Sequence, residues 1–419
     1  MTSALACPAP AWPWAMTRFV SVVAVIGGIA AIGLTVSIAL FMPILNWDLL
    51  AYVGVVKSWG LHSAPAIQAA AYGDVHRFAV THGLPRAWDD LISPANPYRS
   101  RVATNPVAFM RQLPFYRIRP LYLLLLWLVS RFTATVSAAA VTVSAMSLLF
   151  SALVLSVFAG RRLGSVAAAV WPAMFCLTPV VMEAARLQTP DALATFMVVT
   201  AGVLFLGGRE LVAALVLLIA VLIRTDLMRL AVALGVVSAA FDRWAGRKLS
   251  GTTLCVLLGA ALLEVAVTRW WHGYGYLTLL KFTFVDRAAD PAVAAAARLS
   301  LPTFLGDIWR GAVLAIAARK FPTVVVLALG VPFLFDRRAT RRESVVLYAA
   351  LVLYLLAHWV LFPSLAGRFA APVYGGLFAV LVGEAGRWRA SLIQNRWNPS
   401  IVPISNPNVV ATRTLRSVA

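Results

Sequence analysis

Ionisable side chains that could do chemistry lie in this sequence where long apolar runs end. Asp48 follows the first run, in Asn-Trp-Asp-Leu-Leu-Ala-Tyr, and Asp191 closes a polar connection that begins at Glu183. Charged groups at membrane depth are costly and often mark function. A carboxylate within hydrogen-bond reach of a hydroxyl can act as a general base. Asp48, Asp191 and Glu183 are therefore the candidate catalytic residues.

Three arginines in comparable positions are candidates for holding an anion. Arg186 precedes Thr-Pro-Asp191, Arg224 divides two short apolar runs, and Arg368 precedes the last run. A planar guanidinium matches a phosphate group with two parallel hydrogen bonds. The alternative for each arginine is that its side chain extends to the membrane interface without binding substrate.

The carboxylates also have structural alternatives. Asp48 can be the N-cap of a helix over Leu49–Trp59, and Asp191, next to a proline, can interact with the amides at a helix start. The whole stretch Glu183–Asp191 can be a polar turn between two helices.

The sequence leaves a metal site undecided. Glu183 and Asp191 with water would suit a hard cation such as Mg²⁺ or Mn²⁺, but no ligand spacing is diagnostic. Three histidines scattered in a long loop, His62, His76 and His82, are more often surface residues than ligands. The three cysteines lie far apart and predict neither a metal site nor a disulfide framework.

Composition indicates an integral membrane protein. The chain has 419 residues, of which 61% are hydrophobic, and its 36 Lys and Arg against 16 Asp and Glu give a net charge of +20. Soluble domains are nearer half apolar. The basic residues lie between apolar runs, which favours an anionic partner at the membrane, such as a lipid head group or a lipid-linked phosphate, over nucleic acid.

The hydrophobic runs predict one all-α polytopic membrane domain over residues 1–419. Length alone predicts about ten spanning helices. The principal runs are Phe19–Leu45, Phe132–Gly160, Leu163–Met182, Ala192–Gly208, Leu211–Ile223, Leu230–Phe241, Leu249–Thr268, Phe321–Phe335, Ser344–Leu361 and Phe369–Gly383. Leu49–Trp59 and Pro120–Val129 are predicted to be interfacial or re-entrant helices of a long first loop.

Basic residues set the predicted orientation. The short connections at Arg161-Arg162, Arg209, Arg243–Lys248 and Arg337–Arg342 share one side with Arg18. The positive-inside rule makes that side cytoplasmic, with both termini. The outer loops are then about 46–119, 183–191, 224–226, 269–320 and 362–368. In this topology the candidate residues collect on the outer face of a bacterial inner membrane.

Several motifs in chain order resemble the polytopic glycosyltransferases of the GT-C fold, particularly bacterial enzymes related to aminoarabinose and protein mannosyl transferases. Asp48 is followed four residues later by Tyr52, and Pro120-Leu121-Tyr122 opens the run after the first loop. The remaining motifs are Arg-Leu-x-Thr-Pro-Asp at 186–191, Arg224, and Arg368 with Phe369 and Pro372. The chain departs from the family pattern at Arg119, where a further proline is common.

The resemblance implies a GT-C-like bundle with a long first periplasmic loop. It also implies inverting transfer of a sugar from a polyprenyl-phosphate donor to a lipid, glycan or protein acceptor. Asp48 would be the base, and Tyr52, Tyr122, Arg186, Arg224 and Arg368 would bind substrate. The alternatives are a transporter or flippase of a lipid-linked anion, which often shows an internal repeat that this sequence lacks, and a non-catalytic assembly factor.

Overall fold

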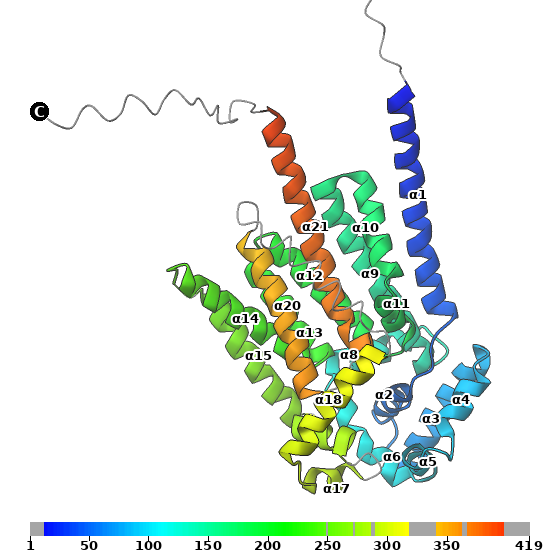
Figure 1. Cartoon of the computed structure of the whole chain (residues 1–419). Coiled ribbons are helices and arrows are strands. Elements are labelled where there is room, and N and C mark those ends of the chain that lie inside the picture. Colours follow the sequence, from blue (N-terminus) through cyan, green and yellow to red (C-terminus); the bar gives the residue numbers. More distant parts are fainter. Residues whose placement is uncertain are drawn as a thin grey trace, which may run out of the picture.

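The computed structural model describes residues 12–248, 250–270, 273–285, 290–317, 341–362 and 367–397. Within these ranges the secondary structure is helical, apart from one isolated parallel β-bridge between Ile44 and Leu187 (Figure 1). The predicted all-α class is confirmed for this part of the chain.

Five of the described helices are long and apolar enough to cross a membrane. They are α1 (Trp12–Phe41), α9 (Val136–Leu163), α15 (Gly251–Trp270), α20 (Arg342–Leu361) and α21 (Gly367–Trp397). A sixth span is formed if α10 (Ser165–Leu177) and α11 (Pro179–Arg186), which meet at an angle of 69°, count as one broken helix. Such helices are those of a multi-pass membrane protein.

The expected count of about ten spans is not reached in the described residues. Two expected spans become the short helices α12 (Asp191–Leu206), with 16 residues, and α13 (Glu210–Ile223), with 14 residues. At about 1.5 Å per residue each is shorter than the ~30 Å hydrocarbon core. The run Phe321–Phe335 lies outside the described residues.

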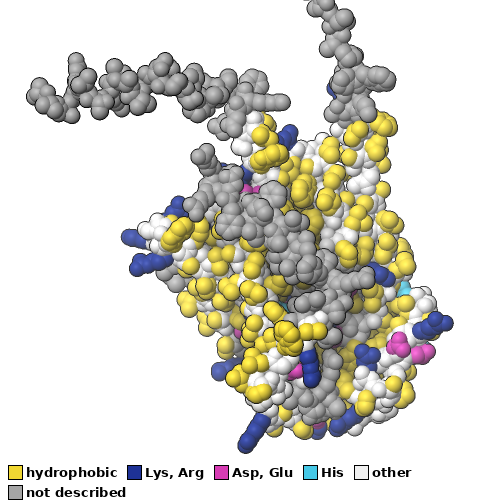
Figure 2. All heavy atoms as spheres, in the orientation of Figure 1, with side chains coloured by type: hydrophobic (Ala, Val, Ile, Leu, Met, Phe, Trp, Pro, Cys, Tyr) yellow, Lys and Arg dark blue, Asp and Glu magenta, His cyan; other side chains and the backbone are white. Residues whose placement is uncertain are grey.

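The bundle is built around α12, which packs against α9, α13 and α21. In contrast, α1 lies at the edge of the bundle against α9, α10 and α11. Only 11% of the most apolar stretch of α1 is buried. Hydrophobic side chains cover much of the flank of the bundle (Figure 2). This distribution fits helices whose outer faces meet lipid.

The long first loop folds into a group of short helices at one end of the bundle. Figure 1 shows this group at the end opposite the N-terminal end of α1 and the C-terminal end of α21. A proline at the first or second position starts each helix from α3 to α8, where its missing amide hydrogen costs nothing. These helices are α3 (Ala64–Thr81), α4 (Pro85–Ile92), α5 (Pro97–Thr104), α6 (Pro106–Gln112), α7 (Pro114–Arg117) and α8 (Pro120–Val129).

The helix expected over Leu49–Trp59 forms as α2 (Trp47–Lys57), but it is not interfacial. Every residue from Leu49 to Val56 is buried. The helix packs against α3, α7, α8 and α9, and its apolar residues are spread around the whole circumference. A helix that is hydrophobic all round belongs in a core, and this distribution distinguishes α2 from a surface helix.

A buried carboxylate fixes the first loop to the bundle. Asp74 on α3 accepts hydrogen bonds from the amides of Val136 and Ser137, both at 3.1 Å, and from the Ser137 hydroxyl at 2.7 Å. Lys57 lies 3.0 Å from the same side chain. Asp74 thereby satisfies two amides that the first turn of α9 leaves free.

The stretch that follows α15 also touches the first loop. After α14 (Leu227–Trp244) and α15, the chain forms α16 (Tyr276–Leu280), a π-helical turn over Lys281–Val285, α17 (Pro291–Ala296) and α18 (Leu301–Ala317). Asp290 pairs with Arg111 of α6, and the Tyr274 hydroxyl donates to the Arg111 carbonyl at 3.1 Å. These contacts join the two loops at the same end of the bundle.

Candidate functional site

Two connections far apart in sequence run side by side and bring the candidate carboxylates together. The amide of Ile44, between α1 and α2, donates to the Arg186 carbonyl at 3.0 Å, and Ile44 bridges Leu187. Arg186 Nε donates to the Met42 carbonyl at 2.7 Å. The starts of α2 and α12, which carry Asp48 and Asp191, therefore lie next to each other.

Asp48 is held in place by two side chains from other elements. Its Oδ1 accepts a hydrogen bond from the Tyr116 hydroxyl at 3.0 Å, and its Oδ2 lies 2.8 Å from Arg368 Nη2. The N-cap of α2 is Asn46, not Asp48, since the Asn46 side chain accepts from the Asp48 amide at 3.2 Å. The Asp48 carboxylate therefore does not cap α2, and its oxygens bind Tyr116 and Arg368 instead.

The charge state of Asp48 follows from opposing effects. Burial raises the pKa of this carboxyl, but the positive charges of Arg368 and Arg119, together with the hydrogen bonds from Arg368 and Tyr116, outweigh burial and hold the pKa below its ordinary value. Asp48 is therefore ionised at neutral pH. Its side chain is 21% exposed, so it can be reached from outside.

Asp191 lies deeper, with a side chain only 4% exposed. Its Oδ2 accepts from the Thr189 hydroxyl at 2.5 Å and lies 3.9 Å from Arg368 Nε, while Oδ1 pairs with Arg224. Within the described residues, the Asp191 carboxylate therefore contacts these side chains and not helix-terminal amides. Arg368 therefore faces both Asp48 and Asp191, and the two carboxylates belong to one cluster.

Arg224 is fully engaged inside the protein. Its Nε and Nη2 bind the two oxygens of Asp226 at 2.7 and 2.8 Å, and its Nη1 binds Asp191. The Arg224 side chain is 4% exposed. Burial by itself raises the pKa of Asp226, but the Arg224 charge overcomes this effect and lowers it strongly. Arg224 thus acts as a buried brace between two helix ends.

Phe369 and two side chains of α20 complete the inner part of the cluster. The guanidinium carbons of Arg224 and Arg368 lie 5.0 and 4.9 Å from the centre of the Phe369 ring. Tyr354 donates to Asp226 at 3.0 Å, and His358 Nδ1 lies 3.5 Å from the same oxygen. The charges therefore alternate in a row from Asp48 through Arg368, Asp191 and Arg224 to Asp226.

The two predicted substrate-binding tyrosines lie behind Asp48. Tyr52 and Tyr122 are both almost fully buried, and their ring centres are 5.0 Å apart. Tyr52 also meets the edge of Tyr116 at 5.1 Å. These rings form a layer that supports the carboxylate, and Tyr122 in particular has no exposed surface from which to meet a ligand.

Glu183 and Arg186 lie near the cluster without joining it. Glu183 is half-buried on α11, and a Cβ added to Gly367 would lie 2.7 Å from Glu183 Oε2, so the carboxylate sits against the start of α21. A negative charge there suits a helix N-terminus. Among the described residues, no hydrogen bond or ion pair joins the Glu183 side chain to Arg368, Arg224 or the other side chains of the cluster. Arg186 serves the Met42 carbonyl.

The side chains of the cluster do not fit a divalent cation. Asp48, Asp191 and Asp226 each face a guanidinium, which already neutralises the charge that a metal ion needs. In the described parts of the chain, no three His, Cys, Asp or Glu side chains form a group suited to metal binding. Of the loop histidines, His76 packs on Trp88 and His82 bonds the Phe78 carbonyl.

The sequence assigns no role to several members of the site, namely Tyr116, Arg119, Asp226, Tyr354 and His358. The first loop contains many tyrosines and arginines, and the sequence does not show that the side chains of Tyr116 and Arg119 point toward Asp48. His358 offered a clearer signal, because it is an ionisable residue inside the apolar run Ser344–Leu361.

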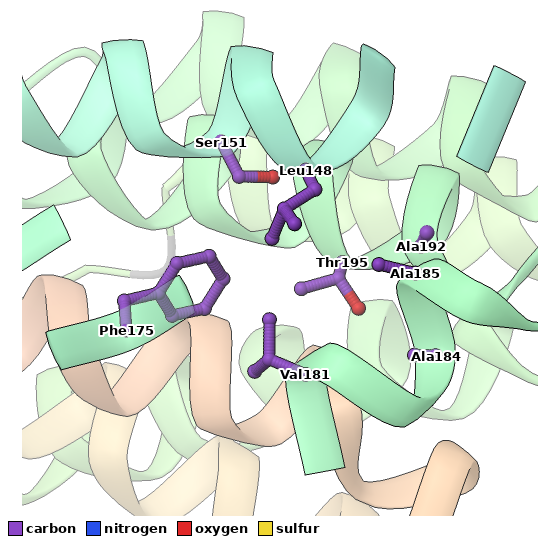
Figure 3. Close-up of a pocket in the computed structure, with 8 residues that line it drawn as sticks. All are labelled: Leu148, Ser151, Phe175, Val181, Ala184, Ala185, Ala192 and Thr195. Atoms are coloured by element: carbon purple, nitrogen blue, oxygen red, sulfur yellow. The ribbon is translucent and has the colours of Figure 1, made fainter. Parts of the chain in front are cut away.

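A small cavity lies beside α12, one turn from Asp191. Leu148, Phe175, Val181 and Thr195 are among the side chains that line it (Figure 3). The space open to the centre of a water molecule is about 10 Å³, which is near the minimum for a single water. This cavity is therefore a packing defect and not a substrate pocket.

Comparison of the chain with protein-family models, with curated proteins and with solved structures gives no match.

Proposed function

We propose that this protein is an integral membrane glycosyltransferase that moves a sugar from a polyprenyl-phosphate donor to a lipid, glycan or protein acceptor. The observation that carries the proposal is the pairing of Asp48, partly exposed and ionised, with Arg368 at a distance of 2.8 Å. A base and a phosphate-binding cation side by side are what such a transfer needs. The resemblance of the motifs to GT-C enzymes adds to this support.

The proposed reaction is a single inverting displacement. The acceptor oxygen attacks the anomeric carbon, and Asp48 takes the proton of the attacking hydroxyl. The bond between the anomeric carbon and the phosphate oxygen breaks, and its electron pair stays with the phosphate. Arg368 stabilises the negative charge that grows on that oxygen. Arg224 does not touch substrate in this scheme, because its three nitrogens are already bound.

The proposed location is the periplasmic face of a bacterial inner membrane, with both termini cytoplasmic. The support is geometric: α2 to α7 lie at the end of the bundle opposite the N-terminal end of α1 and the C-terminal end of α21 (Figure 1). We also propose a GT-C-like bundle of about ten spans, in which α12, α13 and α14 supplement the longer helices.

The function is tested by sugar transfer with the purified protein in detergent. Labelled polyprenyl-phosphate sugars serve as donors and a membrane-lipid extract as acceptor. The account predicts labelled product that depends on protein and donor. If the protein in liposomes instead moves the intact labelled donor across the bilayer and forms no product with any donor, the transporter alternative replaces the enzyme.

A further inference from the structure

Arg119 differs from the other arginines of the cluster because it faces no carboxylate. It is half-buried at the start of α8, and its Nη1 donates a hydrogen bond to the Tyr52 hydroxyl. Its guanidinium carbon lies 5.3 Å from the centre of the Tyr52 ring and 5.6 Å from that of Tyr116. Among the described residues, no carboxylate lies within ion-pair distance of it.

Two guanidinium nitrogens near Asp48 also lack acceptors. In the described chain, Nε of Arg119 and Nη1 of Arg368 are buried without a hydrogen-bond partner. An N–H group of a charged side chain that is buried without an acceptor costs free energy. A bound ligand that supplies the missing acceptors offsets this cost. The acceptor that suits two guanidinium groups is an anionic oxygen.

The two arginines flank the same carboxylate. Arg368 binds Asp48 directly, and Arg119 lies over the ring of Tyr116, whose hydroxyl holds Asp48 from the other side. Both positive charges act on the Asp48 carboxyl and lower its pKa. An anion bound between Arg119 and Arg368 would therefore lie next to the proposed base.

We propose that Arg119 is a second anion-binding residue of the site and that, together with Arg368, it binds the phosphate group of the lipid-linked donor. This inference rests on the proposed function for the identity of the anion. Arg119 lies near the rings of Tyr52 and Tyr116 and donates a hydrogen bond to the Tyr52 hydroxyl. Its position therefore does not depend on an ion pair within the protein.

Charge balance explains why Arg119 is needed. Arg368 and Arg224 between them face three carboxylates, those of Asp48, Asp191 and Asp226. When Asp48 takes the proton, Arg368 loses one counter-charge while the phosphate gains a negative charge. The total charge of the site stays constant, and Arg368 can exchange Asp48 for the phosphate. Arg119 holds the phosphate before that exchange, while Arg368 is still occupied.

The test is direct binding, which needs no turnover. Purified protein is titrated with a short-chain isoprenyl monophosphate and, separately, with the matching isoprenyl alcohol. Three variants are compared with the wild type: Arg119→Gln, Arg119→Lys and Tyr52→Phe. Arg131→Gln is the matched control, because Arg131 also lies on an aromatic ring, 4.5 Å from the centre of Trp127, but is exposed.

The wild type should prefer the monophosphate to the alcohol. Arg119→Gln should weaken monophosphate binding by about tenfold or more, which corresponds to one lost charge-assisted contact, and leave alcohol binding unchanged. Arg119→Lys and Tyr52→Phe should lie between, the second because it removes the hydroxyl that holds Arg119 in place. Arg131→Gln should bind nearly as the wild type does. The Tyr52→Phe result separates loss of the Arg119 charge from loss of the hydrogen bond that holds Arg119 in place.

Equal monophosphate affinity in Arg119→Gln and wild type would overturn the inference, as would a wild type that binds the alcohol equally well. A free uronic acid that binds through Arg119 while the monophosphate does not would assign the anion to the sugar or acceptor and also overturn it. These results are distinguishable from failure of the proposed function, in which the monophosphate binds through Arg119 but no sugar is transferred.

Discussion

Asp48 Oδ2 and Arg368 Nη2 lie 2.8 Å apart and join α2, near the start of the chain, to α21, near its end. This ion pair is the exposed end of a row of alternating charges whose inner members, Asp191 and Arg224, have side chains only 4% exposed. The buried part fixes the helix ends in place. The exposed part is where substrate can arrive.

Breaking the buried brace should destabilise the fold. Arg224→Gln would leave Asp191 and Asp226 without their main counter-charge in a buried setting. Removing one partner of a buried pair costs about 3–5 kcal/mol, so the free energy of unfolding should fall by about that amount. Equilibrium unfolding in mixed detergent micelles measures it.

Arg243→Gln is the control for the brace, because Arg243 is exposed at the end of α14. It should change the free energy of unfolding by no more than about 0.5 kcal/mol. Equal losses in both variants would show that the Arg224 pairings contribute nothing specific to stability.

Removing the Arg119 charge should alter the pH dependence of transfer. Burial raises the pKa of Asp48, while the charges of Arg368 and Arg119 lower it by a larger amount. Transfer needs ionised Asp48, so activity is lost as pH falls through its pKa, which in the wild type lies below the ordinary 3.8. In Arg119→Gln that pKa rises, and the acid limb of kcat/KM should move to higher pH.

Arg119→Lys keeps the charge and should keep the acid limb close to that of the wild type. An acid limb that does not move in Arg119→Gln, or moves to lower pH, would contradict the electrostatic role given to Arg119. The profile is measured over a pH range in which both proteins remain monodisperse.

The attachment of the first loop should depend on Asp74. Asp74→Ala removes the acceptor for the Val136 and Ser137 amides at the start of α9. Loss of such charged hydrogen bonds at a helix start costs about 2 kcal/mol. Hydrogen exchange of these two amides should accelerate, and the unfolding temperature should fall, whereas exposed Asp89→Ala should change neither.

The sequence predicts which residues belong to the site better than it predicts which residues contact one another. The ends of the apolar runs, together with the predicted topology, put Asp48, Asp191, Arg224 and Arg368 on one face of the membrane. The cluster contains all four residues. Hydrophobic periodicity could not reveal that Arg224 is saturated by carboxylates, since pairing depends on side-chain direction. Nor could it find Arg119, whose importance comes from the tyrosine rings on which it lies.

The error in the prediction for α2 has a physical cause. Hydropathy reports how apolar a segment is, but not whether lipid or protein surrounds it. For that reason α2 was predicted to be interfacial although it is buried within the first-loop helices. The run Leu163–Met182 is predicted as one span, and α10 and α11 can together form that span, but the chain bends by 69° between them, where Pro179 starts α11.

The central claim is that Asp48 is the base, and sugar transfer by Asp48→Asn tests it most directly. This variant keeps the shape of the side chain and removes its basicity, so the rate should fall by about 10²–10⁴-fold. Glu183→Gln, which alters a carboxylate outside the cluster, and Asp89→Asn, which alters an exposed one, should each retain most of the activity. Transfer by Asp48→Asn at the wild-type rate, or an equal loss in Glu183→Gln, would contradict the account.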